Sequence, residues 1–331
     1  MGEEGRQTDT GIKVPKWRFM DYILGKLDFC FWLQTAFRIL RSYSSLAGVP
    51  SFPILVCSPM IAMLAPDDFS GEAGMFDLEL GGRVAIVTGG SDGLGRATAR
   101  RLAAEGCKVV ICARRQDYLQ AAAAALAEET GGTVVAQAAD VTRPADIEAL
   151  VAATLERFGG IDILVNNASS SAAAALEDLD DAAWHADIEL KLMAAVRLCR
   201  AIVPLMRQRG GGAIVNATIP GGKAPTARSL PTSVTRAAGI NLTKSLANEF
   251  AADGIRVNTV CIGPIKSAQW ERRAGDKPVD ELYAQMAERV PLGHVGEAAD
   301  YADLVAFLVS QRARYITGTA VNLDGGMSPV V

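Results

Sequence analysis

The chain has 331 residues, half of them apolar, and a formal net charge of −4 at pH 7. This length and composition suit a globular protein with a sizeable core, in one large or two smaller domains. The mildly acidic balance excludes the basic surface that nucleic acid requires, so no nucleic-acid partner is expected.

Residues 1–74 differ in composition from the rest and are interpreted as an N-terminal extension of a domain at 75–331. Apolar residues at helical spacing alternate with Lys and Arg over 17–43. Prolines interrupt the apolar run 45–64, which argues against a membrane-spanning helix, and the segment lacks the charged lead of a signal peptide. Three interpretations stay open: a membrane-surface helix, a docking arm, or sequence upstream of a true start at Met75, which we favour.

From Leu78 onward, apolar runs alternate with helical patterns. Strands are predicted at 84–88, 108–112, 133–137, 161–165, 213–216, 256–260 and 320–323. Helices are predicted at 95–105, 118–129, 145–158, 181–209, 232–252 and 298–310, the fourth with a bend near Pro204. Strands that are apolar on both faces and separated by helices indicate an α/β fold, a Rossmann-type doubly wound parallel sheet.

The turn between the first strand and the first helix is rich in glycine. Glycine allows a sharp turn and lets the backbone approach a phosphate, and the helix N-terminus offers unpaired N–H groups and a positive dipole end to an anion. This strand–turn–helix context predicts a dinucleotide pyrophosphate site. Its candidate residues are Thr88, Gly89, Ser91, Asp92, Gly93, Leu94 and Gly95.

The cysteines and histidines give no sign of a metal site. The six cysteines show no metal-type spacing and are interpreted as buried free thiols of a reducing compartment, which favours the cytoplasm. His185 has no Cys, Asp or Glu at a ligand spacing that recurs elsewhere in the chain. We therefore expect no bound metal.

Further motifs follow the glycine turn in order: Asp140-Val141, Asn166-Asn167-Ala168, Gly318-Thr319 and Asp324-Gly325-Gly326. Together they make residues 75–331 resemble the short-chain dehydrogenase/reductase family, in its branch of 3-oxoacyl-acyl-carrier-protein-reductase-like members. The resemblance implies an adenine site at Asp140 and Val141 and a homodimer or homotetramer assembled through two long helices. It also implies cofactor contacts from Asn166, Asn167, Arg236, Ile265 and Ser267.

The end of the second strand indicates which dinucleotide is bound. Such folds hold the ribose 2′-hydroxyl of NAD with an acidic residue there, and the 2′-phosphate of NADP with a cation. Ala113 stands at the acidic position and Arg114 follows it. This predicts NADP(H), and the alternative is that Arg114 and Arg115 are solvated arginines at a helix start.

All four of the family's catalytic positions are replaced in this chain. Aligning the family's Tyr-x-x-x-Lys motif puts Thr232 at the tyrosine and Arg236 at the lysine, with Ile219 at the serine and Lys191 at the asparagine. A threonine hydroxyl is far less acidic than a tyrosine, so Thr232 can hydrogen-bond a substrate oxygen but is a poor proton donor. Arg236 can reach the nicotinamide ribose but stays protonated.

Lys191 is the candidate replacement acid. At the asparagine position it would lie near Arg236, and two close cations lower a lysine pKa. Such a lysine could protonate an alkoxide, bind a carboxylate or form a Schiff base, and the alternative is an ammonium that reaches solvent. The segment 265–293 resembles the family's substrate lid. Tyr283 within it and His294 just after it are further candidate acids, and the simpler alternative is that they are packing or surface residues.

These residues predict an enzyme with a small-molecule substrate. We expect an NADP-dependent oxidoreductase that transfers hydride between NADP(H) and a small carbonyl or hydroxyl compound, with an atypical proton donor. Two alternatives stay open: a non-redox lyase or isomerase that uses Lys191, and a catalytically silent nucleotide-binding partner. The fold alone does not separate them.

Overall fold

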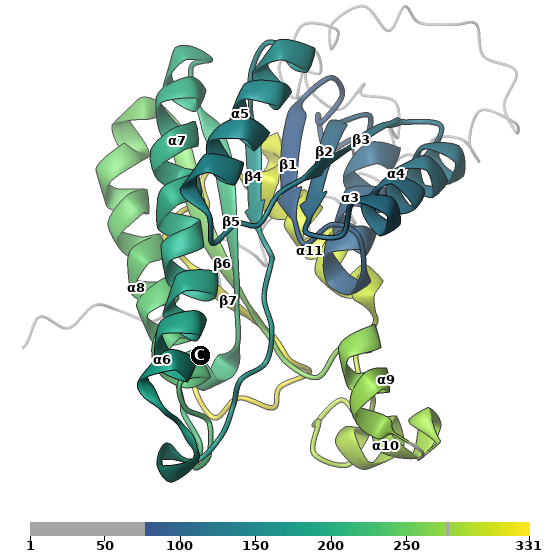
Figure 1. The fold of residues 1–331 in the computed structure, drawn as a ribbon, viewed down its shortest axis with the longest axis vertical. Coiled ribbons are helices and arrows are strands. Elements are labelled where there is room, and N and C mark those ends of the chain that lie inside the picture. The colour runs from purple at the N-terminus through teal and green to yellow at the C-terminus, as the bar shows by residue number, and fades with distance from the viewer. Residues whose placement is uncertain (1–76, 276–277) are drawn as a thin grey trace, which may run out of the picture. The chain divides into compact units, whose positions relative to one another are not determined.

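The computed structural model describes residues 77–275 and 278–331, and Figure 1 shows their fold. Seven parallel strands form one sheet in the order β3-β2-β1-β4-β5-β6-β7. The strands are β1 (Val84–Thr88), β2 (Lys108–Ala113), β3 (Thr133–Ala138), β4 (Ile163–Asn166), β5 (Gly212–Thr218), β6 (Ile255–Ile262) and β7 (Ala320–Leu323). The predicted doubly wound α/β fold is confirmed.

Helices cover both faces of the sheet. One face carries α3 (Gly93–Ala104), α4 (Gln116–Thr130) and α11 (Ala298–Val309), and the other carries α5 (Pro144–Phe158), α7 (Ala194–Gln208) and α8 (Thr232–Phe250) (Figure 1). The remaining helices are α6 (Asp181–Ile188), α9 (Ala268–Ala274) and α10 (Val279–Ala287), with a π-helical turn η2 (Glu189–Met193) and 3₁₀ turns η1 (Leu176–Asp178), η3 (Pro220–Gly222), η4 (Ala251–Asp253) and η5 (Gln311–Ala313).

The strand side chains divide the core into two layers. Val87 and Ile111 belong to the cluster under α3, α4 and α11, whereas Ile86 and Val110 belong to the cluster under α5 and α7. Successive side chains of a strand point to opposite faces. Because both faces are covered, the strands are largely apolar, and their carboxyl ends lie at one edge of the sheet, where ligands bind in such folds.

The long helix predicted over 181–209 is interrupted. The break is the π-helical turn η2 (Glu189–Met193), while Pro204 lies inside α7. A π-helical turn inserts one extra residue and re-aims the side chains around it. Here it coincides with a buried lysine, Lys191, whose contacts with α6 and α8 replace exposure to water.

Several predictions concern residues at the chain's N-terminal end. The extension 1–74, including the amphipathic stretch 17–43, lies outside the described residues.

Within the described residues, no helix is long and apolar enough to span a bilayer, and no group of His, Cys, Asp or Glu could hold a metal ion. The cysteines in this part of the chain, Cys107, Cys112, Cys199 and Cys261, are buried and free.

Candidate active site

The glycine turn follows β1 and opens α3, as its sequence context predicts. Gly89 and Gly93 have positive φ angles of 66° and 51°, which side chains rarely adopt. A Cβ at Gly95 would lie 2.2 Å from the carbonyl oxygen of Gly89, so helix and turn pack too closely for any other residue. The turn thus presents bare backbone at the helix N-terminus, which is the cradle that a pyrophosphate requires.

The turn is fastened to the end of the neighbouring strand β4. The backbone N–H groups of Asn167 and Ala168 both donate to the Thr88 hydroxyl at 2.9 Å, and the Asn167 amide donates to the Thr88 carbonyl at 2.9 Å. Asn166 donates its amide to Asn216 on β5 at 2.8 Å. These contacts fix the crevice between β1 and β4, the point where the strand order reverses.

Asp92 begins α3 and shows a second role for a residue predicted to bind cofactor. Its side chain accepts a hydrogen bond from the Gly93 N–H at 2.8 Å and caps the helix. The residue also lines the cavity described below. The structure therefore shows Asp92 as the cap of α3 and as part of the cavity lining.

The end of β2 carries exposed positive charge. Arg114 is exposed directly after Ala113, whereas the Arg115 guanidinium lies over the Tyr118 ring, 4.5 Å from its centre. Burial raises the pKa of the nearby Asp140 carboxyl. Hydrogen bonds from Thr142 and the charge of Arg114 outweigh burial and hold that pKa below its ordinary value. Arg114 is therefore available to an anionic group at this corner, close to the predicted adenine site.

A cavity of about 470 Å³ joins the glycine turn to the predicted catalytic positions. Gly93 and Ser267 both line it and lie close together, since a Cβ on Gly93 would lie 4.0 Å from that of Ser267. Thr232 and Arg236, one turn apart at the start of α8, line its inner wall. The cavity therefore brings together residues that are more than 130 positions apart in sequence, as the family resemblance implies.

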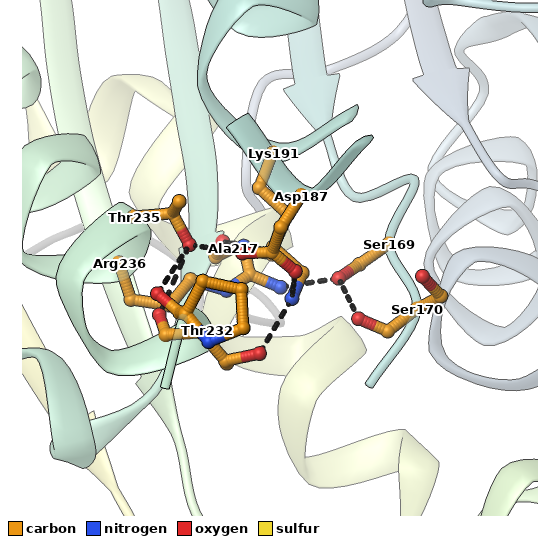
Figure 2. Close-up of polar contacts among 9 residues, drawn as sticks. Ser169, Ser170, Asp187, Lys191, Ala217, Thr232, Thr235 and Arg236 are labelled. Carbon is orange, nitrogen blue, oxygen red and sulfur yellow. Dashed lines mark hydrogen bonds and ion pairs between the residues drawn. The ribbon is translucent and has the colours of Figure 1, made fainter. Parts of the chain in front are cut away.

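Lys191 lies behind Thr232. Its side chain is fully buried, which is inconsistent with an ammonium reaching solvent. Its Nζ donates to the Thr232 Oγ1 at 2.7 Å and forms an ion pair with Asp187 (Figure 2). The lysine therefore reaches the cavity through the threonine hydroxyl. A direct transfer from Lys191 to substrate, in which Thr232 would be dispensable, does not fit this geometry.

Arg236 is anchored but keeps one donor unused. Its guanidinium donates to the Ala217 carbonyl and to the Ser169 hydroxyl (Figure 2). The buried Nε atom has no hydrogen-bond partner within the described part of the chain. Burial lowers the pKa of Arg236 to about 10, so the side chain remains charged at neutral pH.

The lysine and arginine share one anion. Burial lowers the pKa of Lys191 below its ordinary value; Asp187 opposes this, and the charge of Arg236 adds to it. The expected influence of the neighbouring cation is present, but desolvation is the larger cause. Fully ionised, the three groups carry a net charge of +1 behind the cavity wall. Such a wall favours negative charge developing on a bound oxygen.

Among the remaining candidates, Ile219 and the adjacent Thr218 line the cavity, whereas Tyr283 and His294 do not. Ile219 has an apolar side chain, and the Thr218 hydroxyl donates to the Val260 carbonyl at 3.3 Å. The Tyr283 hydroxyl accepts the Ser267 N–H at 3.1 Å, and the exposed His294 ring contacts the Leu292 carbonyl. Tyr283 therefore holds the start of α9 and His294 lies at the surface, as their simpler explanations stated.

Sequence reasoning missed Asp187, Ser169 and Thr235. Asp187 precedes Lys191 by one helical turn, the spacing of an ion pair, and Thr235 lies three residues after Thr232 on the same helix face. Both spacings were visible in the sequence. That the two pairs meet across α6 and α8 was not, because it depends on tertiary packing.

Comparison with known proteins supports the family resemblance. A family model described as enoyl-(acyl carrier protein) reductase matches residues 89–328. A putative ketoacyl reductase of Streptomyces coelicolor is 34% identical over 252 residues, covering 74% of this chain and 96% of that protein. The human (Homo sapiens) dehydrogenase/reductase SDR family member 4 is 37% identical over 248 residues, covering 75% of this chain and 88% of that protein.

Solved structures agree with these relatives. L-sorbose reductase from Gluconobacter frateurii, complexed with NADPH and L-sorbose, is 37% identical with a TM-score of 0.75, covering 77% of this chain and all of that one. A variant of the actinorhodin polyketide ketoreductase with NADPH is 34% identical with a TM-score of 0.71, covering 75% and 98% of the two chains. With the glycine turn, the strand order and the cavity in place, this chain belongs to the short-chain dehydrogenase/reductase (SDR) family.

Proposed function

We propose that the protein is an NADP(H)-dependent oxidoreductase that transfers hydride between the nicotinamide and a small carbonyl or hydroxyl substrate. The observation that carries the proposal is the Lys191–Thr232 hydrogen bond at the inner wall of the cavity, opposite the glycine turn. Reductase activity is named for the relatives, and two similar solved structures are NADPH complexes.

Cofactor binding follows from the parts of the cradle. The turn from Gly89 to Gly95 fits the pyrophosphate, Asp140 and Val141 the adenine side, and Arg114 the 2′-phosphate of NADP. Arg236, which lines the cavity, fits a ribose hydroxyl. Asn166 and Asn167 fasten the end of β4 to β5 and β1, and Ile265 and Ser267 line the cavity. The bound cofactor would supply or accept the hydride.

Proton delivery uses two side chains in series. As hydride adds to the carbonyl carbon, the carbonyl oxygen gains negative charge and takes the proton of the Thr232 hydroxyl. The Lys191 ammonium returns a proton to Thr232 Oγ1 along the 2.7 Å hydrogen bond and becomes a neutral amine. Solvent reprotonates the amine after product leaves. Threonine is thus a relay, and the acidity that it lacks comes from the lysine.

Charge at the wall assists the same step. The net charge of +1 from Asp187, Lys191 and Arg236 falls to zero as Lys191 gives up its proton, which matches the neutralisation of the substrate alkoxide. The arrangement disfavours a Schiff-base reaction, since the Lys191 nitrogen faces Asp187 and Thr232 rather than the cavity. The redox proposal is therefore preferred to a lyase or isomerase.

Two accompanying proposals concern assembly and location. We propose a homodimer or homotetramer assembled through the long helices α7 and α8, which cover the same face of the sheet (Figure 1). Light scattering of the purified chain tests this, and a monomer at micromolar concentration would contradict it. The buried free cysteines of the described residues support a reducing, cytoplasmic environment.

Single-turnover oxidation of NADPH with a panel of ketones tests the proposed function. Wild-type protein should oxidise NADPH with at least one ketone of the panel, and Tyr283→Phe should do so at the wild-type rate. No oxidation with any ketone, together with tight NADPH binding, would favour the silent nucleotide-binding alternative. Reduction that depends on the Tyr283 hydroxyl would move the proton donor to the lid.

A further inference from the structure

Behind the cavity wall, the Asp187 carboxylate accepts hydrogen bonds from two different elements of the described chain, the π-helical turn η2 and the helix α8. Asp187 lies in the last turn of α6, is 3% exposed, and uses both carboxylate oxygens. One oxygen accepts from the Lys191 ammonium, and the other accepts from the Thr235 hydroxyl at 2.6 Å (Figure 2). Its partners thus come from the π-helical turn on one side and from α8 on the other.

The four side chains form a matched set. Asp187 and Lys191 are four residues apart, and Thr232 and Thr235 are three apart, so each pair shares one face of its helix. Lys191 contacts Thr232 and Asp187 contacts Thr235. The ammonium is therefore held between a fixed carboxylate and the hydroxyl at the cavity. Without the carboxylate, Lys191 would keep one acceptor here and face Arg236 with no intervening anion.

We propose that Asp187, held by Thr235, is a positioning residue that aims the Lys191 ammonium at the Thr232 hydroxyl and keeps it ready to give up a proton. This inference rests on the proposed function, since it assigns the residue that makes the Lys191–Thr232 relay work. Asp187 itself does not line the cavity and makes no contact that would require it to touch substrate.

A buried ion pair away from substrate is otherwise costly. Taking two charges out of water is repaid only with good geometry and further hydrogen bonds, and apolar residues of similar size often stabilise a fold better. The Thr232 and Thr235 hydroxyls supply those hydrogen bonds. They also fix the direction of the ammonium, which a purely structural pair would not need.

The charged groups acting on Lys191 within the described residues are Asp187 from α6 and Arg236 from α8. Burial lowers the pKa of Lys191, Asp187 opposes the fall, and Arg236 adds to it. Removing the carboxylate must therefore lower that pKa further. The alkaline limb of the single-turnover pH profile, where Lys191 loses its proton, should move to lower pH in Asp187→Asn.

The test compares Asp187→Asn with Asp187→Glu and a matched control, Glu189→Gln. Glu189 lies two residues away and pairs with Arg197 outside the cavity at 2.6 Å. Two quantities are measured: the pH profile of single-turnover NADPH oxidation, and the titration midpoint of Lys191 by ¹³Cε NMR of lysine-labelled protein. The Lys191 signal is assigned as the one absent from Lys191→Met.

Asp187→Asn should lower the Lys191 midpoint by about one pH unit and the rate above that midpoint about tenfold. Glu189→Gln should change neither. Asp187→Glu keeps the charge but displaces the ammonium, so it should keep the midpoint and reduce the rate at all pH values. If Asp187→Asn does not fold, Asp187→Glu tests the proposal in its place. A wild-type rate in Asp187→Glu would then overturn the proposal.

An unchanged Lys191 midpoint in folded Asp187→Asn would overturn the assignment of Asp187, as would an equal loss of rate at every pH. The NMR titration needs no turnover. If wild-type protein oxidises no NADPH, the proposed function fails separately, and the midpoint still decides whether Asp187 controls Lys191.

Discussion

The two ends of the cavity are built from different materials. At the cofactor end, the site is formed by backbone groups without side chains, because Gly89, Gly93 and Gly95 leave room that a Cβ would fill. At the catalytic end, the site is formed by four side chains joined by hydrogen bonds, those of Asp187, Lys191, Thr232 and Thr235. The position of each depends on the others. A backbone cradle tolerates little change, whereas a side-chain relay can be rebuilt if its members change together.

The largest expected effect is on stability, from Lys191→Met. It leaves the Asp187 carboxylate buried without its cation, and breaking a buried pair in this way costs about 3–5 kcal/mol. Urea denaturation measures the free energy of unfolding. The double variant with Asp187→Asn should recover part of the loss. Lys266→Met, which breaks an exposed pair with Glu297, is the control and should cost far less, because solvent screens an exposed pair. A loss as small as the control's would contradict the buried ion pair.

Gly95→Ala tests the cradle. A Cβ there would meet the Gly89 carbonyl oxygen at 2.2 Å, and overpacking of this kind costs about 1–3 kcal/mol, or roughly tenfold in affinity. NADPH affinity measured by calorimetry should fall at least that far. Gly81→Ala is the matched control, because nothing lies within 4 Å of its added Cβ and affinity should not change. Equal affinities in both variants would show that the turn does not hold cofactor.

Arg114→Asp sharpens the comparison at the outer edge of the cradle. Loss of a charge-assisted hydrogen bond to the 2′-phosphate should reduce the NADPH preference over NADH by about tenfold or more. Arg157→Asp carries the same change of charge on the exposed side of α5 and should leave the preference alone. Titration of both cofactors decides, and an unchanged preference in Arg114→Asp would remove the argument for NADP from this position.

The smallest expected effect comes from removing residues 1–74. All strands of the sheet and both ends of the cavity lie after Met75. A variant beginning at Met75 should keep the melting temperature and NADPH affinity of the full chain. Loss of either would make the extension part of the fold. Loss of liposome binding alone would support the membrane-surface interpretation of residues 17–43.

The sequence predicted the cofactor end better than the catalytic end for a physical reason. Where the backbone needs a positive φ angle or a close approach, almost no residue can replace glycine. The turn from Thr88 to Gly95 can therefore be recognised from the sequence alone. The predicted strands also match, because burial on both faces requires apolar runs. At the catalytic end the aligned positions of Thr232 and Lys191 could be found, but their contact could not.

Two details there depended on packing alone. The π-helical turn at Glu189–Met193 contains no proline or glycine that would predict it, and it lies before α7, the helix that contains Pro204. The role of Asp187 arises where α6 meets α8, and its i,i+4 spacing to Lys191 is equally typical of a solvated surface pair. Burial, which separates these cases, is a property of the folded chain.

The central claim is that Lys191 and Thr232 act as one proton-delivery unit. The direct measurement is single-turnover NADPH oxidation with a reactive ketone by wild type, Lys191→Met, Thr232→Val and the double variant, with NADPH affinity as the check on folding. General acid catalysis contributes about 10²–10⁴-fold, so each single variant should lose at least a hundredfold, and the double variant should be no slower than the slower single one. Losses that multiply in the double variant, or a Thr232→Val rate equal to wild type, would contradict it.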